Sequence, residues 1–181
     1  MQDIPPLSCN GIIKRYADNL VLNDVSLSLE KGEIFGLIGL NGVGKTTLIK
    51  IILDLSRADK GSAMLFGEPS THATARRNVS YLPERFQPSR YLRGREYLSL
   101  CMSYFGKTLD TALAQEEAKE LDLSAEALER KVGSYSKGMG QKLGLMGAFM
   151  AGAPFLILDE PMSGLDPRAR IKLKERIMKE K

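Results

Sequence analysis

The sequence is poor in cysteine and has no long apolar run. Its two cysteines, Cys9 and Cys101, lie far apart and lack metal-ligand spacing, which is typical of free thiols in a reducing compartment. No apolar run approaches the roughly 20 residues of a membrane-spanning helix, and residues 1–6 lack the basic and apolar regions of a signal peptide. We therefore expect a cytosolic protein whose association with any membrane depends on a partner.

Long blocks of like charge are also missing. Lys and Arg total 26 against 22 Asp and Glu, which gives a net charge of +4 spread along the chain. Scattered charge does not indicate a nucleic-acid-binding surface, and the small basic excess fits a solvated surface or a weak preference for an anionic partner. With 181 residues, 43% of them hydrophobic, the chain is long enough for one soluble domain with its own core.

The most informative segment is residues 39–46, Gly-Leu-Asn-Gly-Val-Gly-Lys-Thr, which fits the P-loop pattern G-x-x-x-x-G-K-[ST]. The apolar run Ile34–Ile38 before it predicts a short buried strand, and Thr46–Leu53 after it predicts a helix. Strand, glycine-rich turn and helix is the order in which backbone N–H groups can surround a phosphate at a helix N-terminus. A glycine-rich turn beside a surface lysine is the alternative interpretation.

Each residue type in this segment has a predicted role in binding a nucleoside triphosphate. Glycines let the backbone approach the phosphates closely, Lys45 should reach the β- and γ-phosphates, and Thr46 should place its hydroxyl on Mg²⁺. The residues expected to contact ATP in this segment are Asn41, Gly42, Val43, Gly44, Lys45, Thr46 and Thr47.

A second motif, Phe155–Glu160, is an apolar strand that ends in two carboxylates. A parallel strand presents its carboxyl end at the ligand crevice, so Asp159 is a candidate Mg²⁺ ligand and Glu160 a candidate general base for the attacking water. Together with Lys45, Glu160 is our candidate catalytic residue. A plain strand end with acidic residues in the following loop is the alternative.

A third motif, residues 134–141, precedes a predicted helix and has Ser136 as its candidate N-cap. A helix start with a small hydroxyl and a glycine suits phosphate binding, and an ordinary loop and cap is an equally good interpretation of this segment alone. Elsewhere, short strands are predicted within Leu7–Leu29 and at Ala63–Phe66 and Val79–Leu82, followed by helices from Glu84 to Gly152. A last helix begins at Pro167.

Taken together, these motifs resemble the nucleotide-binding domain of ATP-binding cassette (ABC) transporters. The P-loop is followed by a helical insert, the signature-like residues 136–139, Leu158–Pro161, and then Ser163–Asp166, which resembles the D-loop. The resemblance implies an α/β fold: a P-loop NTPase core with a mainly parallel sheet, an N-terminal antiparallel β subdomain and an inserted helical subdomain. One ABC ATPase domain would span 1–181, with 1–83 and 153–181 in the core and β subdomain and 84–152 in the helical subdomain.

The resemblance also implies a dimer, either of two copies or of two different ABC domains, arranged head to tail. Ser136 and Gly138 would then contact ATP held by the partner subunit's Lys45, and Asp166 would cross the dimer interface. Tyr16 lies where the family places an aromatic ring that stacks on adenine, although an ordinary strand aromatic is the alternative. ATP and Mg²⁺ are the implied cofactors.

At two positions the sequence departs from the usual family pattern, and in both it resembles the ATPases of ABC-2-type exporters. Lys137 replaces the first glycine of the signature, and Glu84 stands at the Q-loop position. Glu84 could still meet Mg²⁺, with Gln87 as a less favoured substitute. This subgroup implies an ATP-hydrolysing subunit that powers a separate transmembrane permease and binds no nucleic acid. The subunit would lie at the inner face of the cell membrane, attached to it only through the permease.

A third departure concerns the switch histidine that the family has beyond the D-loop. The only histidine here, His72, precedes the helical block and cannot match it. The resemblance therefore implies a C-terminally truncated domain. Two alternatives remain open: a soluble ABC ATPase that acts on ribosomes or DNA, and a nucleotide-binding module without turnover.

Overall fold

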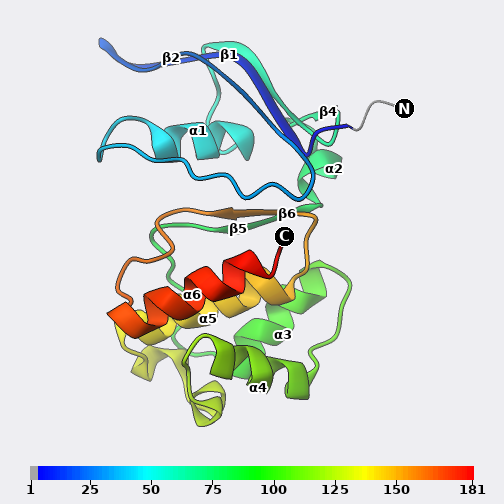
Figure 1. Cartoon of the computed structure of the whole chain (residues 1–181), viewed down its shortest axis with the longest axis vertical. Helices are drawn as coiled ribbons and strands as arrows, with labels where there is room; N and C mark the ends of the chain where they lie inside the picture. Colours follow the sequence, from blue (N-terminus) through cyan, green and yellow to red (C-terminus); the bar gives the residue numbers. More distant parts are fainter. Residues whose placement is uncertain (1–3) are drawn as a thin grey trace. The chain divides into compact units, whose positions relative to one another are not determined.

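The computed structural model describes residues 4–181, which divide into two compact units. The first unit ends at Val79 and the second runs from Ser80 to Lys181. Figure 1 shows the strands and helices of each. Each unit is described separately below.

The first unit is built on a four-stranded antiparallel sheet in the order β2-β1-β3-β4. Its elements are β1 (Leu7–Tyr16), β2 (Asn19–Leu29), α1 (Lys45–Ile52), β3 (Lys60–Leu65), β4 (Glu68–Pro69) and α2 (Ala73–Arg76). In the central strand, Cys9 pairs with Leu27 on one side and with Ala63 on the other. The predicted N-terminal antiparallel β region is therefore confirmed.

Helix α1 buries one apolar face and contacts strands β2 and β3. Its buried residues, Leu48, Ile51 and Ile52, recur at the three- and four-residue spacing of a helix face. Ile12 and Leu65 are fully buried in the sheet of the same unit. This core fixes the position of the helix whose first residue is Lys45.

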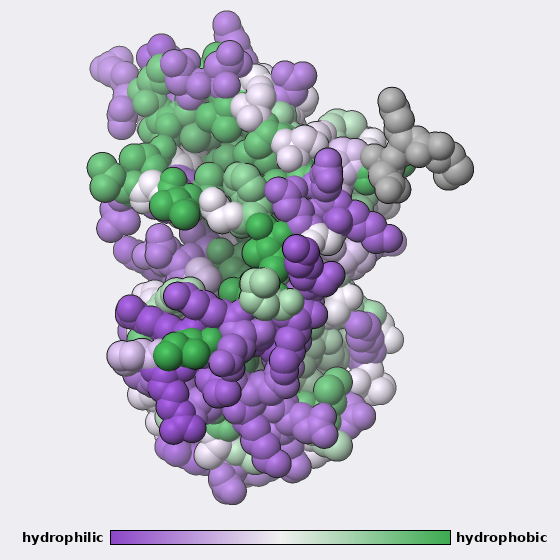
Figure 2. Space-filling model, in the orientation of Figure 1, coloured by the Kyte–Doolittle hydropathy of each residue, from purple (hydrophilic) through white to green (hydrophobic). Residues whose placement is uncertain are grey.

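The segment that leads into the P-loop and forms its first residues differs from the sequence-based expectation. Residues 33–40 form no strand, and the side chains of Ile38 and Leu40 are 94% and 81% exposed. The prediction of a buried strand at Ile34–Ile38 is wrong for this structure, because no described strand offers this segment a hydrogen-bonded ladder. An extended chain needs such pairing to become a strand. Figure 2 shows apolar surface gathered over the first unit.

The second unit combines a two-stranded sheet with a helical bundle. Its elements are β5 (Val79–Leu82), which begins at the boundary, α3 (Gly94–Tyr104), α4 (Thr111–Glu120), the 3₁₀ helices η1 (Ala125–Glu129) and η2 (Val132–Ser134), α5 (Lys137–Met150), β6 (Phe155–Leu158) and α6 (Pro167–Met178). β5 and β6 occupy the predicted residues. The backbone N–H of Asp159 donates to the carbonyl of Leu82 at 2.9 Å, so both strands end side by side and run parallel.

Helix α5 is the centre of the second unit. All ten residues from Gln141 to Met150 are buried, and α5 contacts both α3 and α4. A helix that is apolar on every side is stable only when other elements surround it. The antiparallel sheet, the parallel strand pair and the bundle together give the α/β class expected for a P-loop NTPase.

Candidate nucleotide-binding site

The glycines of the P-loop take backbone conformations that other residues avoid. Gly42 and Gly44 have φ angles of +82° and +103°. A Cβ added at Gly44 would lie 2.8 Å from Leu22 Cδ2 and 2.9 Å from the carbonyl oxygen of Val21. Gly44 therefore has neither the space nor the conformation for a side chain, and the loop lies directly against β2.

Lys45 is the first residue of α1, and its side chain folds back over the loop. Its Nζ donates to the carbonyl oxygens of Gly39 at 2.8 Å and Leu40 at 3.0 Å. The cation and the helix N-terminus thus lie at the same place, which is the electrostatic setting for an anion. The left-handed glycines, the cation and the hydroxyls of Thr46 and Thr47 in the first helical turn fit the phosphates of a nucleotide.

Tyr16, the candidate adenine-stacking residue, ends β1 and lies close to the start of α1. Its side chain is 49% exposed, and Lys14 Nζ lies 5.3 Å from the ring centroid. Hydrogen bonds to Ser56 and, more weakly, to Thr47 lower the pKa of the Tyr16 phenol. The interaction with Thr47 places the phenol near the start of α1, the helix that begins at Lys45.

In the second unit, carboxylates gather where β5 and β6 end. Asp159, which follows β6, is buried and lies beside Leu82, while Glu84 follows β5 by two residues and is exposed. Both charges act on Tyr81: burial is the main cause of the raised pKa of its phenol, and the negative charges of Asp159 and then Glu84 raise it further. Two of the three predicted magnesium ligands therefore lie near one side chain.

Glu160, the candidate general base, has a φ angle of +49°, which is uncommon for a residue with a side chain. Its carbonyl accepts a hydrogen bond from the backbone N–H of Ser163 at 3.0 Å, closing a tight turn. Strained backbone of this kind is often found at functional sites. No residue pattern around Glu160 predicted this conformation.

The signature-like segment starts α5 as predicted. Ser136 is the N-cap, and its Oγ accepts from the backbone N–H of Met139 at 3.2 Å. Gly138 lies against the following loop, since an added Cβ would be 2.9 Å from the carbonyl oxygen of Gly164. Asp166, assigned to a dimer interface by resemblance, caps α6 by accepting from Ala169 N–H at 2.9 Å.

The structure thus gathers the predicted residues into two sets, one in each unit. The P-loop residues and Tyr16 form the first set. Asp159, Glu160, Glu84, Ser136 and Gly138 belong to the second. Among residues 4–181, no group of three or more His, Cys, Asp or Glu side chains could hold a metal. This agrees with the composition of the predicted Mg²⁺ ligand set, which consists of one hydroxyl, that of Thr46, and only two carboxylates, those of Asp159 and Glu84.

Sequence reasoning missed Gln141 as a candidate. It is 6% exposed, and its Nε2 donates to the carbonyl oxygen of Pro161 at 3.1 Å, directly after Glu160. The available signal was an amide inside the otherwise apolar α5, because a buried polar side chain requires a hydrogen-bond partner.

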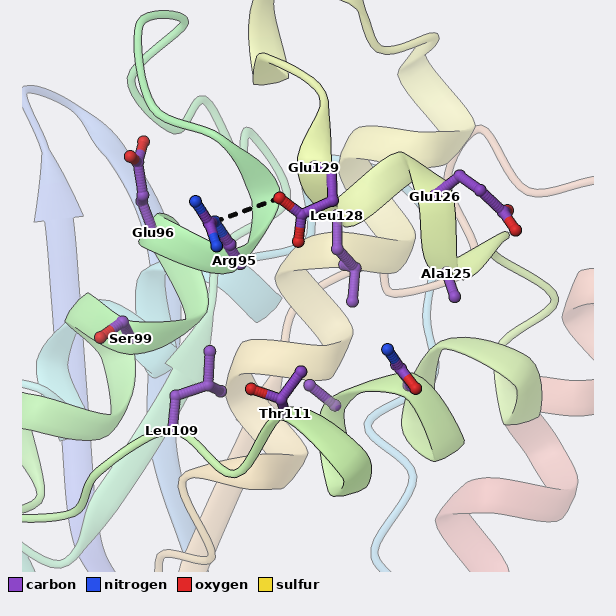
Figure 3. A pocket seen from close by; sticks show the side chains of 11 residues that line it. Arg95, Glu96, Ser99, Leu109, Thr111, Ala125, Glu126, Leu128 and Glu129 are labelled. Atoms are coloured by element: carbon purple, nitrogen blue, oxygen red, sulfur yellow. Dashed lines mark ion pairs between the residues drawn. The ribbon is translucent and has the colours of Figure 1, made fainter.

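The second unit also has a pocket of about 510 Å³ between α3, the start of α4 and η1. Figure 3 shows Arg95 and Glu129 facing each other there, joined by an ion pair of 3.3 Å. None of the candidate residues lines this pocket, so it is separate from the nucleotide motifs. Within the described chain, every helix is too short or too polar to pass through a bilayer.

Comparison with known proteins agrees with these motifs. Residues 22–163 match the model of the family described as "ABC transporter". The "Nod factor export ATP-binding protein I" of Burkholderia orbicola is 38% identical over 180 residues, covering 96% of this chain and 58% of the relative. An uncharacterised ABC transporter ATP-binding protein of Nostoc sp. is also 38% identical, over 87% of this chain and 48% of the relative. The chain thus spans about half the length of these relatives.

Solved structures show the same fold. A putative ABC transporter ATP-binding protein from Pyrococcus furiosus superposes with a TM-score of 0.85 at 25% identity, over 96% of this chain and 84% of the other. A structure titled as the ATP-binding subunit of an ABC transporter superposes with a TM-score of 0.80 at 33% identity, over 96% and 74%. From its motifs, its fold and the family match, the chain belongs to the ABC transporter family and carries its ATP-binding region.

Proposed function

We propose that this chain binds and hydrolyses ATP as a subunit of an ABC exporter of the ABC-2 type and powers a separate transmembrane permease. Nucleotide binding is supported by the glycine-rich loop that ends at Lys45. The Nζ of Lys45 donates hydrogen bonds to the carbonyl oxygens of Gly39 and Leu40 in this loop. A phosphate is a charged acceptor, and hydrogen bonds from a lysine to a charged acceptor are stronger than those to a neutral one.

The same residues have defined roles in the proposed reaction. Lys45 and the backbone N–H groups of the loop hold the phosphates, while Thr46, Asp159 and Glu84 would hold Mg²⁺, which neutralises phosphate charge when bound. Glu160 accepts a proton from water as the water oxygen attacks the γ-phosphorus in line. The bond to the bridging oxygen breaks, and ADP leaves with that electron pair.

The exporter assignment rests on two kinds of support. Lys137 and Glu84 stand where the ABC-2 exporter ATPases carry such departures, and the Burkholderia relative is named for export. In the proposed assembly two ABC domains, identical or different, pair head to tail, with Ser136 and Gly138 on ATP held by the partner subunit's Lys45. The chain would lie at the inner face of the cell membrane, held there by the permease and without nucleic acid.

Titration calorimetry and phosphate release test this proposal. Lys45→Ala should abolish ATP binding, whereas Lys31→Ala, which removes an exposed lysine elsewhere in the first unit, should leave it unchanged. Glu160→Gln should bind ATP with wild-type affinity and release phosphate at least about 100-fold more slowly. Normal hydrolysis by Glu160→Gln would exclude the general-base role, and an absence of heat from folded wild-type protein would exclude nucleotide binding.

A second candidate is a nucleotide-binding module without turnover. ATP binding with no measurable phosphate release by the wild-type chain would support this candidate, and robust release would contradict it.

A further inference from the structure

We propose that Gln141 is a positioning residue that fixes the orientation of Glu160 through the nearby peptide group between Pro161 and Met162. The inference rests on the proposed function, because it assigns Gln141 a task only if Glu160 acts on water. It concerns a contact within one unit, between helix α5 and the loop that follows β6.

The contact is direct and buried. Gln141 lies in the second turn of α5 with 6% of its surface exposed, and its Nε2 donates to the carbonyl oxygen of Pro161 at 3.1 Å. No buried side-chain nitrogen or oxygen among the described residues lacks a hydrogen-bond partner. An apolar residue of similar size would fill the same space without holding this carbonyl, so the amide contributes orientation as well as packing.

The backbone around Glu160 is held on both sides. Before it, the N–H of Asp159 donates to Leu82 on the neighbouring strand at 2.9 Å, and after it the N–H of Ser163 donates to the Glu160 carbonyl at 3.0 Å. The hydrogen bond from Gln141 adds an anchor on the intervening peptide. A left-handed residue keeps its conformation only when its surroundings enforce it, and Gln141 supplies one such contact, from helix α5.

The start of α5 makes a second contact with the loop that follows β6. Gly138, one turn before Gln141, is so close to Gly164 that a Cβ would lie 2.9 Å from its carbonyl oxygen. The side chain of Lys137 also lies over Gly164, with carbons 3.1 Å from the position of a Cβ there. A shift of the signature-like turn would therefore be transmitted to the loop that carries Glu160.

The test compares Gln141→Met with a matched control, Lys107→Met. Lys107 also donates from its side chain to a backbone carbonyl, that of Ala151 at 2.6 Å, but at the opposite end of α5. Gln141→Met should lower kcat about 10- to 100-fold while the Kd for ATP stays within about twofold. Lys107→Met should change neither constant by more than about twofold.

Two further measurements separate positioning from a structural role. Amide hydrogen exchange in a peptide covering 159–166 should be faster in Gln141→Met and unchanged in Lys107→Met, and this readout does not require turnover. Gln141→Glu can donate to Pro161 only when its carboxyl is protonated, so its kcat relative to wild type should rise as pH falls from 8 to 6.

The outcomes distinguish the two proposals. If Glu160→Gln slows hydrolysis but Gln141→Met hydrolyses at the wild-type rate, the positioning role is wrong and the proposed function stands. If Glu160→Gln hydrolyses ATP at the normal rate, Glu160 is not the general base of the proposed reaction. The proposed role of Gln141 in orienting Glu160 for that reaction is then also wrong. Unchanged hydrogen exchange at 159–166 in Gln141→Met would overturn the inference whatever the hydrolysis rates are.

Discussion

Glu117 of α4 and Arg176 of α6 form an ion pair in which Arg176 Nε and Glu117 Oε1 are 2.8 Å apart, with side chains only 8% and 12% exposed. The Arg176 guanidinium also lies 4.4 Å from the centroid of the Phe149 ring in α5. This cluster therefore ties three helices of the second unit together. Breaking such a pair on one side is costly, because the remaining charge stays buried.

Arg176→Met should destabilise the second unit by about 3 kcal/mol near pH 7.5. Burial already raises the pKa of Glu117 above its ordinary value of 4.5, against the opposing effect of Arg176, and removing Arg176 raises this pKa further. The folded state then binds the proton more tightly than the unfolded state. The stability of Arg176→Met is therefore retained below pH 4.5 and falls as pH rises through the folded-state pKa of Glu117. The stability that this variant loses relative to wild type should thus be smaller at pH 5 than at pH 7.5.

Urea denaturation of wild type and Arg176→Met at both pH values measures this difference. Lys172→Met is the control on the same helix, since its pair with Glu175 is exposed and should change stability by less than about 0.5 kcal/mol. An equal loss at the two pH values would show that Glu117 is not the group responsible.

Gly44→Ala should destabilise the first unit by about 3 kcal/mol and abolish ATP binding. The added methyl group meets Leu22 and the Val21 carbonyl at under 3 Å and sits at a φ of +103°, so overpacking and backbone strain add. Gly32→Ala is the matched control, with a φ of +76° and nothing within 4 Å of its Cβ, and should cost only about 1 kcal/mol. Thermal unfolding measures the loss of stability in both variants. Equal losses would mean that close packing of the loop against β2 does not contribute to the effect of Gly44→Ala.

Tyr16→Ala should weaken ATP binding about 10-fold, because the loss of one base-stacking ring typically costs about 1–3 kcal/mol. Tyr16→Phe keeps the ring and should bind ATP normally. Inorganic tripolyphosphate, which has no base, should bind all three proteins equally. Calorimetric titrations measure these affinities, and a parallel loss of tripolyphosphate binding in Tyr16→Ala would assign Tyr16 to the loop's structure instead.

Asp166→Asn should remove an acid-dependent part of the stability. The N–H of Ala169 lowers the pKa of Asp166 below its ordinary value of 3.8, so its stabilisation is present above pH 3.8 and is lost as pH falls through the folded pKa. Asparagine caps a helix about as well but does not titrate. Thermal unfolding between pH 3 and 7 should therefore show wild type more stable at pH 7 and the two proteins converging toward pH 3.

Local features of the sequence were sufficient to predict much of this molecule. Val79–Leu82 and Phe155–Leu158 were predicted because apolar runs end at Pro83 and at two carboxylates. The start of α5 was predicted from Ser136, whose hydroxyl can cap a helix. Each of these signals lies within a few residues of the element that it marks.

The features that could not be predicted depend on partners distant in sequence. Ile34–Ile38 has the composition of a buried strand, but a strand forms only where another strand pairs with it. The contact of Gln141 with Pro161 joins residues 20 positions apart, which no periodicity reveals. The left-handed backbone of Glu160 follows from the turn that it makes with Ser163, and its residue type does not favour that conformation.

Exposed apolar residues at the start of the P-loop connect the protein's solubility with the binding of its ligand. Ile38 and Leu40 lie only a few residues from Lys45 and present nonpolar surface to water. Sulfate strengthens contacts between nonpolar surfaces, and it is also an anion that a helix N-terminus with a lysine can hold. The choice of buffer salt will therefore change self-association and apparent ATP affinity together, so the two should be measured in the same titration.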